Sequence, residues 1–578
     1  VYKSTLISVA MPAHSLVGTR HADEVQNSLP RFHFEVPNHP LKLLIYAAED
    51  KEFASLRGMD AWDEEPISRG TLADNVEIIG TMMVYKAKSD RAGMLSLIKA
   101  RLVLLGNQQK ALGLTRADAY SPVMKCITFR TFLAQYAGDL EVVFHQLDVE
   151  SAYLTSNVRR TTYITLPARL RPKGHPADSV YNLRKALYGG ADSGRCYYDD
   201  YLQWHLDLGF TQIPHEPCYL KYECKNGTFI VICFYVDDAA YARKGDSLWT
   251  WYLEKLGGKY KYKLGPLDHF LSLRIRRMVN GDFHIDLESQ VDRMLRTFEL
   301  QDASYSKHPV HSNRPTSNDI PTLDEDIKVA NRFPMMAAVG HLNYLQQMLE
   351  WSITYPLKVA SKNVRDGSHG TVHHEWVKHI MKFLKSKSWS RYIIYAQPWS
   401  ELILSAYTDA DHIKAEDDRR SLSGHMILLG RTVIGWGATF QTIASHSSAE
   451  SELMALDTCA RKVVATIWLV EAMGCPKQPT VTIKVDCKPA ISLAENFIPS
   501  SRSSHIHMRF FYVRQLNDEL IIKLEHVNTK EQWADVLVTF KDKFNFDYIM
   551  TCSRGYNARL ILRDGEPATW IERRTARL

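Results

Sequence analysis

Residues 229–242 read FIVICFYVDDAAYA and place two acidic residues between two apolar runs. The first run, Phe229 to Tyr235, is rich in β-branched and aromatic residues and predicts a buried strand. The second run is short and apolar as well, so the segment predicts a hairpin with Asp237 and Asp238 at its tip. Because aspartate also favours ordinary turns by bonding to its own backbone, this hairpin does not define a site by itself.

A second predicted strand upstream also ends in an acid. Residues 141–148, EVVFHQLD, form a β-branched and aromatic run that ends at Asp148. Two-metal phosphoryl transfer needs hard oxygen ligands that hold two divalent ions roughly 3.5 to 4 Å apart. Clustered carboxylates repel one another without a cation. We therefore expect Asp148 and Asp237, with Asp238 close behind, to be metal ligands.

The C-terminal half holds a second acidic set. Asp409 and Asp486 follow apolar runs that predict strands, and Glu450 and Asp535 fall on predicted helices. Such an arrangement suits a second two-metal site, which would activate water to cut a phosphodiester.

Two alternatives stay open in this second set. Residues 447–450, SSAE, also form a capping box, in which Glu450 would bond to the start of a helix over 448–472. Asp411 lies two residues beyond Asp409 and competes with it for the ligand role.

Composition limits the class of protein. The chain has 578 residues, of which 45% are hydrophobic and 24% charged, so we expect two to four globular domains. The net charge of +6 slightly favours a polyanionic partner but does not require one. The nine scattered cysteines indicate reduced thiols without structural zinc. No apolar run approaches the roughly 18 to 20 residues of a membrane span, so we expect no membrane partner.

With these acids in place, the chain resembles the copia-type reverse transcriptases of long-terminal-repeat retrotransposons from about residue 62 to residue 540. The matching motifs occur in the family's order: KARLV (99–103), FHQLDV (144–149), LRKALYG (183–189), LGF (208–210), PC (217–218) and YVDD (235–238). The C-terminal matches resemble the family's ribonuclease H domain: DDRRSLSG (417–424), Trp436, SSAE (447–450), SR (501–502) with HI (505–506), and TKEQWAD (529–535).

The resemblance implies the roles of individual residues. Tyr153 would be the steric gate that selects deoxynucleotides, Lys99 or Arg101 would contact the incoming triphosphate, and Tyr235 would bind substrate. Val149 would join the three polymerase acids as a metal-ligating position. The nuclease ligands would be Asp409, Glu450, Asp486 and Asp535. Each site would take two Mg²⁺ ions, with Mn²⁺ as the alternative.

The resemblance also implies an α+β or α/β multidomain fold, with a right-hand polymerase followed by a ribonuclease H-like domain. We expect an unassigned segment at 1–45, fingers and palm at 46–275, a thumb-like or connecting helical region at 276–395, a ribonuclease H-like domain at 396–545 and a tail at 546–578. The partners would be an RNA template, a DNA primer, the RNA–DNA hybrid and deoxynucleoside triphosphates, with capsid and integrase as further polyprotein products. The location would be a cytoplasmic particle, with the nucleus as the alternative.

Departures from the family pattern support a second hypothesis, an eroded copy that binds nucleic acid without catalysis. Asp192 replaces the usual Gln of the template loop, Ser272 replaces a Gly near the primer grip, and Cys487 replaces the usual Asn after a nuclease acid. None of them removes an expected metal ligand.

A zinc-protease helix at residues 374–379, HEWVKH, is a further alternative. Its two histidines are five residues apart, whereas one helical face requires four. We therefore expect Trp376, Ile380, Phe383 and Leu384 to form the apolar face of an ordinary helix.

Overall fold

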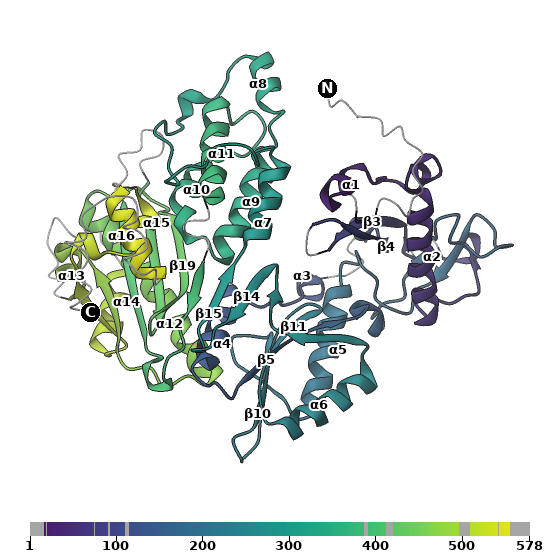
Figure 1. Cartoon of the computed structure of the whole chain (residues 1–578), viewed down its shortest axis with the longest axis horizontal. Coiled ribbons are helices and arrows are strands. Elements are labelled where there is room, and N and C mark those ends of the chain that lie inside the picture. Colours follow the sequence, from purple (N-terminus) through teal and green to yellow (C-terminus); the bar gives the residue numbers. More distant parts are fainter. Residues whose placement is uncertain are drawn as a thin grey trace.

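The computed structural model describes residues 17–18, 20–73, 76–90, 93–109, 115–386, 391–411, 420–495, 509–540 and 543–554. Figure 1 shows three groups of elements around a central sheet that contains β5, β10 and β11. The N-terminal elements lie at the right, the helices α7 to α11 at the top, and the C-terminal elements at the left. The fold is a mixed α/β multidomain fold, as the sequence predicts.

The N-terminal group is built on a two-stranded ribbon with a hydrophobic core of its own. The ribbon pairs β3 (Thr81–Ser89) with β4 (Leu95–Leu104). The helices α1 (Ala22–Ser28) and α2 (Lys42–Gly58) pack against it. The segment 1–45, which the sequence left unassigned, thus contributes α1, η2 (His33–Asn38) and the start of α2.

Short elements complete this group. A small sheet has the order β1-β7-β6-β2. Its strands and the neighbouring turns are β1 (Ile67–Ser68), β7 (Ser179–Asn182), β6 (Tyr163–Ile164), β2 (Ile78–Ile79), η3 (Arg69–Thr71), η4 (Gly106–Gln108) and α3 (Arg116–Ala119).

The central sheet, called here the palm sheet, is antiparallel and has the order β12-β5-β11-β10-β9-β8. The strands are β12 (Tyr262–Pro266), β5 (Val143–Val149), β11 (Asp238–Lys244), β10 (Phe229–Tyr235), β9 (Tyr219–Glu223) and β8 (Thr211–Gln212). The helices α4 (Cys126–Ala137), α5 (Ser193–Asp207) and α6 (Asp246–Lys259) and the turn η5 (Ala152–Thr155) accompany it. Every residue of α4 from Thr128 on is buried, as expected for a helix covered on all sides.

A four-stranded sheet and a helical group follow. The sheet has the order β13-β14-β15-β16, and β16 joins it from more than a hundred residues further along the chain. Its strands are β13 (His269–Phe270), β14 (Leu273–Arg277), β15 (Phe283–Asp286) and β16 (Tyr392–Ile394). The helical group comprises α7 (Glu288–Thr297), η6 (Ser317–Asp319), α8 (Asp324–Ala330), α9 (Met335–Met348), η7 (Trp351–Ile353), α10 (Thr354–Ala360) and α11 (Thr371–Lys385).

The C-terminal group has a five-stranded sheet of order β19-β18-β17-β20-β21. The first three strands are antiparallel hairpins, whereas β20 and β21 run parallel to β17. The strands are β17 (Leu404–Asp411), β18 (Leu422–Leu429), β19 (Thr432–Phe440), β20 (Val481–Val485) and β21 (Ile522–His526). The other elements are η8 (Trp399–Glu401), α12 (Ser448–Met473), α13 (Lys488–Glu495), α14 (Arg509–Asp518), η9 (Thr529–Glu531), α15 (Asp535–Val538) and α16 (Lys543–Arg554).

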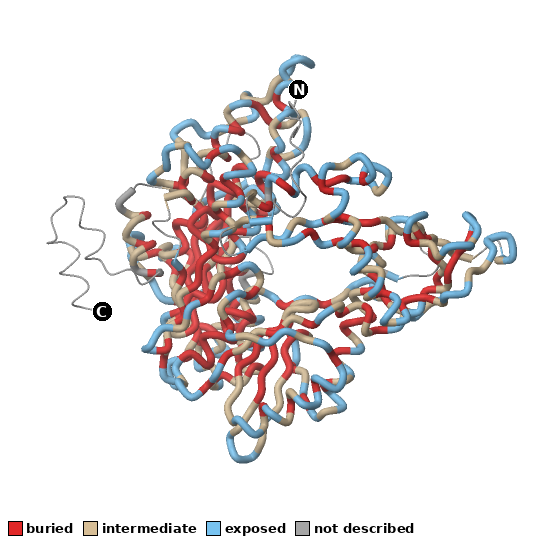
Figure 2. The backbone as a smooth tube through the Cα atoms, turned by 45° about the vertical axis from the view of Figure 1, so that its right-hand side comes forward, coloured by how far each residue is buried: buried red, intermediate tan, exposed pale blue. Residues whose placement is uncertain are grey.

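One continuous hydrophobic core runs through the palm sheet, the helical group and the C-terminal sheet, whereas the N-terminal core is separate. Figure 2 shows the corresponding concentration of buried residues in the body of the molecule. The domain limit expected near residue 395 falls between β16 and η8, whereas the limits at 45, 275 and 545 fall within α2, β14 and α16.

The helix expected at residues 374–384 is confirmed as part of α11, and its four apolar positions are buried. The two histidines of the HEWVKH segment have different partners. The His374 ring nitrogen Nε2 lies 2.9 Å from Nδ1 of His369, and Nε2 of His379 lies 3.0 Å from the carbonyl oxygen of His308. The Glu375 carboxylate accepts a hydrogen bond from Lys378. These separate partners exclude the zinc-protease arrangement.

Candidate active sites

The predicted hairpin is confirmed, and it brings its acids next to β5. Strand β10 leads into a turn at Val236 and Asp237, and β11 begins at Asp238. Asp238 is directly paired with Asp148 across the β5–β11 ladder, so both side chains lie on one face of the palm sheet. The amide of Val149 donates to the Asp237 carbonyl at 3.1 Å, which ties the turn to β5. The three acids predicted for polymerisation therefore lie at one end of two neighbouring strands.

The turn itself is strained. Val236 has a φ of 58°, in the left-handed region that a β-branched residue rarely adopts. Backbone strain of this kind persists only where the surrounding structure imposes it, and it clusters at functional sites.

The acids of this site oppose one another electrostatically. Burial raises the pKa of Asp148, and the nearby Asp237 carboxylate raises it further. Burial, followed by Asp237 and Asp148, raises the pKa of Asp238 to about 6. Lys263 and Lys99 act in the opposite direction on Asp148. Carboxylates in this relation prefer a shared cation or a proton, and their oxygen atoms are the ligands that Mg²⁺ favours.

An aromatic and basic group borders the acids. The Tyr153 and Tyr188 rings lie 4.7 Å apart, and the Arg101 guanidinium lies 4.3 Å above the Tyr188 ring. Burial raises the pKa of Tyr153, with Asp237 adding to the effect. Tyr235, the last residue of β10, is half-buried beside the turn. The structure thus brings Tyr153, Arg101 and the acids into one region.

Lys99 belongs to a basic face of the β3–β4 ribbon. Lys99 lies directly opposite Lys86, and Lys88 and Arg101 lie on the same face by strand alternation. Burial, then Arg101 and Lys88, lowers the pKa of Lys99. Like charges directly opposite one another destabilise a ribbon, so this face favours an anionic ligand.

One of the departures, Asp192, has a structural position that explains it in part. Asp192 is the residue that precedes α5, where the positive end of the helix dipole favours a negative charge. Cys487 follows β20, and burial raises the pKa of its thiol, with the carboxylates of Glu452 and Asp486 adding to the effect.

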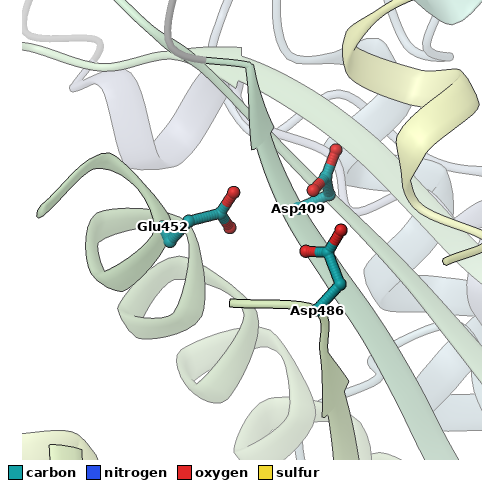
Figure 3. A group of neighbouring side chains, drawn as sticks. All are labelled: Asp409, Glu452 and Asp486. Atoms are coloured by element: carbon teal, nitrogen blue, oxygen red, sulfur yellow. The ribbon is translucent and has the colours of Figure 1, made fainter. Parts of the chain in front are cut away.

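The second acidic site lies on the C-terminal sheet. Asp409 lies on β17, Asp486 follows the parallel neighbour β20, and Glu452 lies on α12. Figure 3 shows the three carboxylates directed toward one another. Candidate ligand atoms of these residues all lie within 4.8 Å of one another, and Asp409 and Glu452 are buried. Among the residues that the structure describes, this is the one group of three or more His, Cys, Asp or Glu side chains drawn so closely together.

This geometry corrects the expectation for Glu450. The backbone amide of Glu450 donates to the Ser447 hydroxyl at 3.2 Å, and its carboxylate accepts from the His446 amide at 2.6 Å. Ser447 is therefore the N-cap of α12, and Glu450 bonds to the backbone one residue before it, which resembles the capping alternative that the sequence left open. Residues two apart on a helix are about 200° apart around its axis, so Glu452, which the sequence reasoning missed, faces the strand ends instead.

The other acids of the second set lie outside the close group. Asp535, the first residue of α15, is buried and accepts a hydrogen bond from the Asn545 side-chain amide at 2.9 Å. Asp411 ends β17, and the structure brings Asp409 rather than Asp411 into the group. The 501–506 segment that matched the nuclease motifs lies outside the described residues, as do Asp417 to Arg419.

The structure thus has one acidic site at the hairpin of the palm sheet and a separate acidic site on the five-stranded sheet. Residues 70–312 match the family model described as reverse transcriptase (RNA-dependent DNA polymerase). Over these residues the chain is similar to reverse transcriptases, and over most of its length it is similar to retrotransposon Pol polyproteins.

The similar curated proteins include two plant transposon products. The retrovirus-related Pol polyprotein from transposon TNT 1-94 of Nicotiana tabacum is 26% identical over 516 residues, which cover 89% of this chain and 38% of that protein. The corresponding polyprotein from transposon RE2 of Arabidopsis thaliana is 27% identical over 484 residues, covering 83% of this chain and 32% of that protein. The chain thus spans about a third of the length of these relatives.

Solved structures are similar at low identity. The crystal structure of LC11-RNase H1 in complex with RNA/DNA hybrid covers 23% of this chain and 93% of that chain, with 13% identity and a TM-score of 0.18. The structure of the foamy viral protease-reverse transcriptase dRH in complex with ds DNA covers 84% of this chain and 70% of that chain, with 11% identity and a TM-score of 0.21. Within the described part of the chain, no helix is both long enough and apolar enough to cross a membrane.

Proposed function

We propose that this chain is an RNA-directed DNA polymerase that also cleaves the RNA strand of RNA–DNA hybrids. The observation that carries the polymerase proposal is the pairing of Asp148 with Asp238 beside the strained Asp237 turn, next to Tyr153 and Arg101. The division into fingers and palm at 46–275, thumb-like region at 276–395 and ribonuclease H-like domain at 396–545 is proposed with it. In the structure, α1 and η2 extend the first of these bodies, and α16 extends the last.

Asp148, Asp237 and Asp238 are proposed to hold two Mg²⁺ ions, with Mn²⁺ as the alternative and Val149 as a neighbouring ligand position. The repulsion that raises the pKa of Asp148 and Asp238 supports this assignment, because bound cations would relieve it. When bound, the metal supplies activation of the primer hydroxyl and stabilisation of the leaving oxygen.

The chain's own side chains would position the nucleotide. The basic face around Lys99 and Arg101 would bind the triphosphate by charge and hydrogen bonds. Tyr153, held between Tyr188 and Tyr197, would crowd the ribose 2′ position and select deoxynucleotides. Tyr235 would contact the substrate from the end of β10.

The nuclease proposal rests on the close carboxylate group. Asp409, Glu452 and Asp486 would hold the metal ions of the second site, and Asp535 is proposed as a further acid of that site. The proposed partners are an RNA template, a DNA primer, the hybrid and deoxynucleoside triphosphates, with capsid and integrase as companions in a polyprotein. The proposed location is a cytoplasmic particle, with the nucleus as the alternative.

The eroded, inactive relic is the second candidate, and Asp192 is the observation that favours it, because the family usually has an uncharged Gln there. Its position before α5 supplies a stabilising role for the acid that is independent of catalysis.

The two candidates separate in a Mg²⁺-dependent primer extension on an RNA template. We expect extension by the wild-type chain and a loss of about 10³-fold or more in Asp237→Asn. Asp246→Asn is the matched control, since Asp246 lies exposed in the first turn of α6 and pairs with Arg243. Binding of the primer–template without extension by the wild-type chain would leave the relic as the better account.

A further inference from the structure

Arg130 is a buried cation whose bonds all leave its own helix. It lies on α4 beneath the palm sheet and is 5% exposed. Its guanidinium donates to the carbonyl oxygens of Gln347 and Met348, the latter at 2.7 Å, and to that of Ile434 at 2.9 Å. The first two acceptors end α9 and the third lies on β19, so one side chain joins three separate groups of elements.

The Trp436 indole takes part in the same contact between α4, α9 and β19. This contact, made by Arg130 and Trp436, is called the joint. The Arg130 guanidinium lies 3.7 Å from the centre of the Trp436 ring, and the indole Nε1 donates to the Gln346 carbonyl at 3.0 Å. Three consecutive carbonyls at the end of α9 are therefore bonded by Arg130 and Trp436. The last carbonyls of a helix lack intrahelical partners and carry the negative end of its dipole, so a cation and an N–H donor match them chemically.

Within the described part of the chain, no carboxylate forms an ion pair with this guanidinium. None of the ion pairs among the described residues includes Arg130. A buried cation is costly unless it is fully hydrogen-bonded, and here the acceptors belong to α9 and β19. The packing of the palm sheet alone does not account for an arginine at this position.

Further contacts fix the same interface. The Gln135 side-chain amide, also on α4, donates to the carbonyl at the end of α12 at 2.9 Å and accepts from the Tyr219 hydroxyl at 3.2 Å. The His215 and Trp468 rings stack across the interface at 5.6 Å. The continuous hydrophobic core covers the whole region, so the C-terminal sheet is packed directly on the palm.

We propose that Arg130 is a positioning residue that locks the palm, α9 and the C-terminal domain into one rigid body, and thereby sets a fixed distance between the primer terminus and the point of RNA cleavage. The part of this inference that concerns the cleavage distance rests on the proposed function. The part that concerns the rigid contact of the palm, α9 and the C-terminal domain does not. Neither Arg130 nor Trp436 contacts the candidate metal ligands through any hydrogen bond or ring contact of the described residues.

The test compares Arg130→Met, Trp436→Phe and a control, Arg57→Met, which removes a partly exposed arginine from α2. A hybrid with an end-labelled RNA strand and a primer blocked at its 3′ end reports where cleavage falls relative to the primer terminus. The wild-type chain and Arg57→Met should cut within one narrow window. Both joint variants should widen and shift that window by several nucleotides, while the extension rate stays within a few-fold of the wild type.

Calorimetry on the same proteins needs no activity. The wild-type palm and C-terminal domain should unfold in one transition, which Arg130→Met should split into two. Trp436→Phe keeps an aromatic ring and serves if Arg130→Met does not fold. Folded joint variants with an unchanged window and a single transition would overturn the inference. If the wild-type chain neither extends nor cleaves, the proposed function fails, and the calorimetric result alone decides on the joint.

Discussion

Two glutamates at the start of α12 show how closely spaced residues take different tasks. Glu450 bonds to the backbone at the helix start, while Glu452 lies beside Asp409 and Asp486. The helix rotation between them is about 200°, so only one of the two can face the strand ends.

Glu452→Gln should therefore lower the rate of hybrid cleavage by about 10²-fold or more. The free energy of unfolding should change little. Glu450→Gln should keep cleavage within a few-fold of the wild type and lower the free energy of unfolding by about 1 kcal/mol, because it weakens the cap. Cleavage assays and urea unfolding of both variants check this. Loss of cleavage in Glu450→Gln alone would restore the original assignment.

The acids that the sequence singled out, and that the structure brings close to other acids, share a physical reason. Asp148, Asp237, Asp409 and Asp486 each end an apolar β-branched run, and such runs are visible without a structure. Glu452 was missed because it lies only two residues, or about half a helical turn, beyond Glu450. Which of the two faces the strand ends depends on the exact residue at which α12 starts. Arg130 belongs to no recognisable motif. It is, however, the one charged residue in the apolar segment ITFRTFLAQYA, and this indicates that its guanidinium has a buried partner.

His374 predicts acid sensitivity of the helical group. Its ring is buried, stacks on Phe333 at 4.6 Å and bonds to His369. Burial, followed by the charge of His369, lowers the pKa of His374 from 6.5 to about 4. The folded state thus favours the neutral ring. Its contribution to stability is complete above about pH 6.5 and is lost as the pH falls toward 4.

His374→Gln should flatten the fall in unfolding free energy across that pH window, because it removes the titration and keeps a polar group. His269, which is exposed, provides the control in His269→Gln. Urea unfolding at a series of pH values measures the slopes, and an unchanged slope in His374→Gln would rule out this role.

At the scale of elements, the tight turn between β13 and β14 carries strain. Leu271 and Ser272 have φ values of 48° and 61°, which both lie in the left-handed region. The family has glycine where this chain has Ser272. Glycine adopts such angles at no steric cost, whereas other residues lose roughly 1 kcal/mol there.

Ser272→Gly should therefore raise the free energy of unfolding by about 1 kcal/mol. The matched control is Ser68→Gly, because Ser68 is exposed with a φ of −68° and should lose stability on gaining backbone freedom. Thermal unfolding of both variants measures the difference. Destabilisation by Ser272→Gly would mean that the serine side chain has a role beyond the turn.

The elements that could be predicted from the sequence were those with a regular hydrophobic pattern and sufficient length. The strands at 229–235 and 481–485 and the long helix that ends before Gly474 are confirmed, since each has a strong pattern and a clear end. The elements before residue 45 were not found. Short helices such as α1 gain their stability from packing on β3, which no local pattern records.

At the scale of the whole molecule, the palm, the helical group and the C-terminal sheet share one core. The sequence placed domain limits at residues 275 and 545, and β14 and α16 cross these two positions. The reason is that β16 closes the β13–β16 sheet from a distant part of the chain, and long-range pairings of this kind are not visible in local composition.

The central claim is that one chain carries two separate metal-dependent phosphoryl-transfer sites. The most direct measurement follows a labelled primer and a labelled RNA template in one tube, with Mg²⁺, for the wild-type chain, Asp237→Asn and Asp486→Asn. The account predicts that Asp237→Asn loses extension and still cleaves a preformed hybrid, while Asp486→Asn extends the primer and leaves the RNA intact. Loss of both activities in either folded variant, or of neither in both, would contradict it.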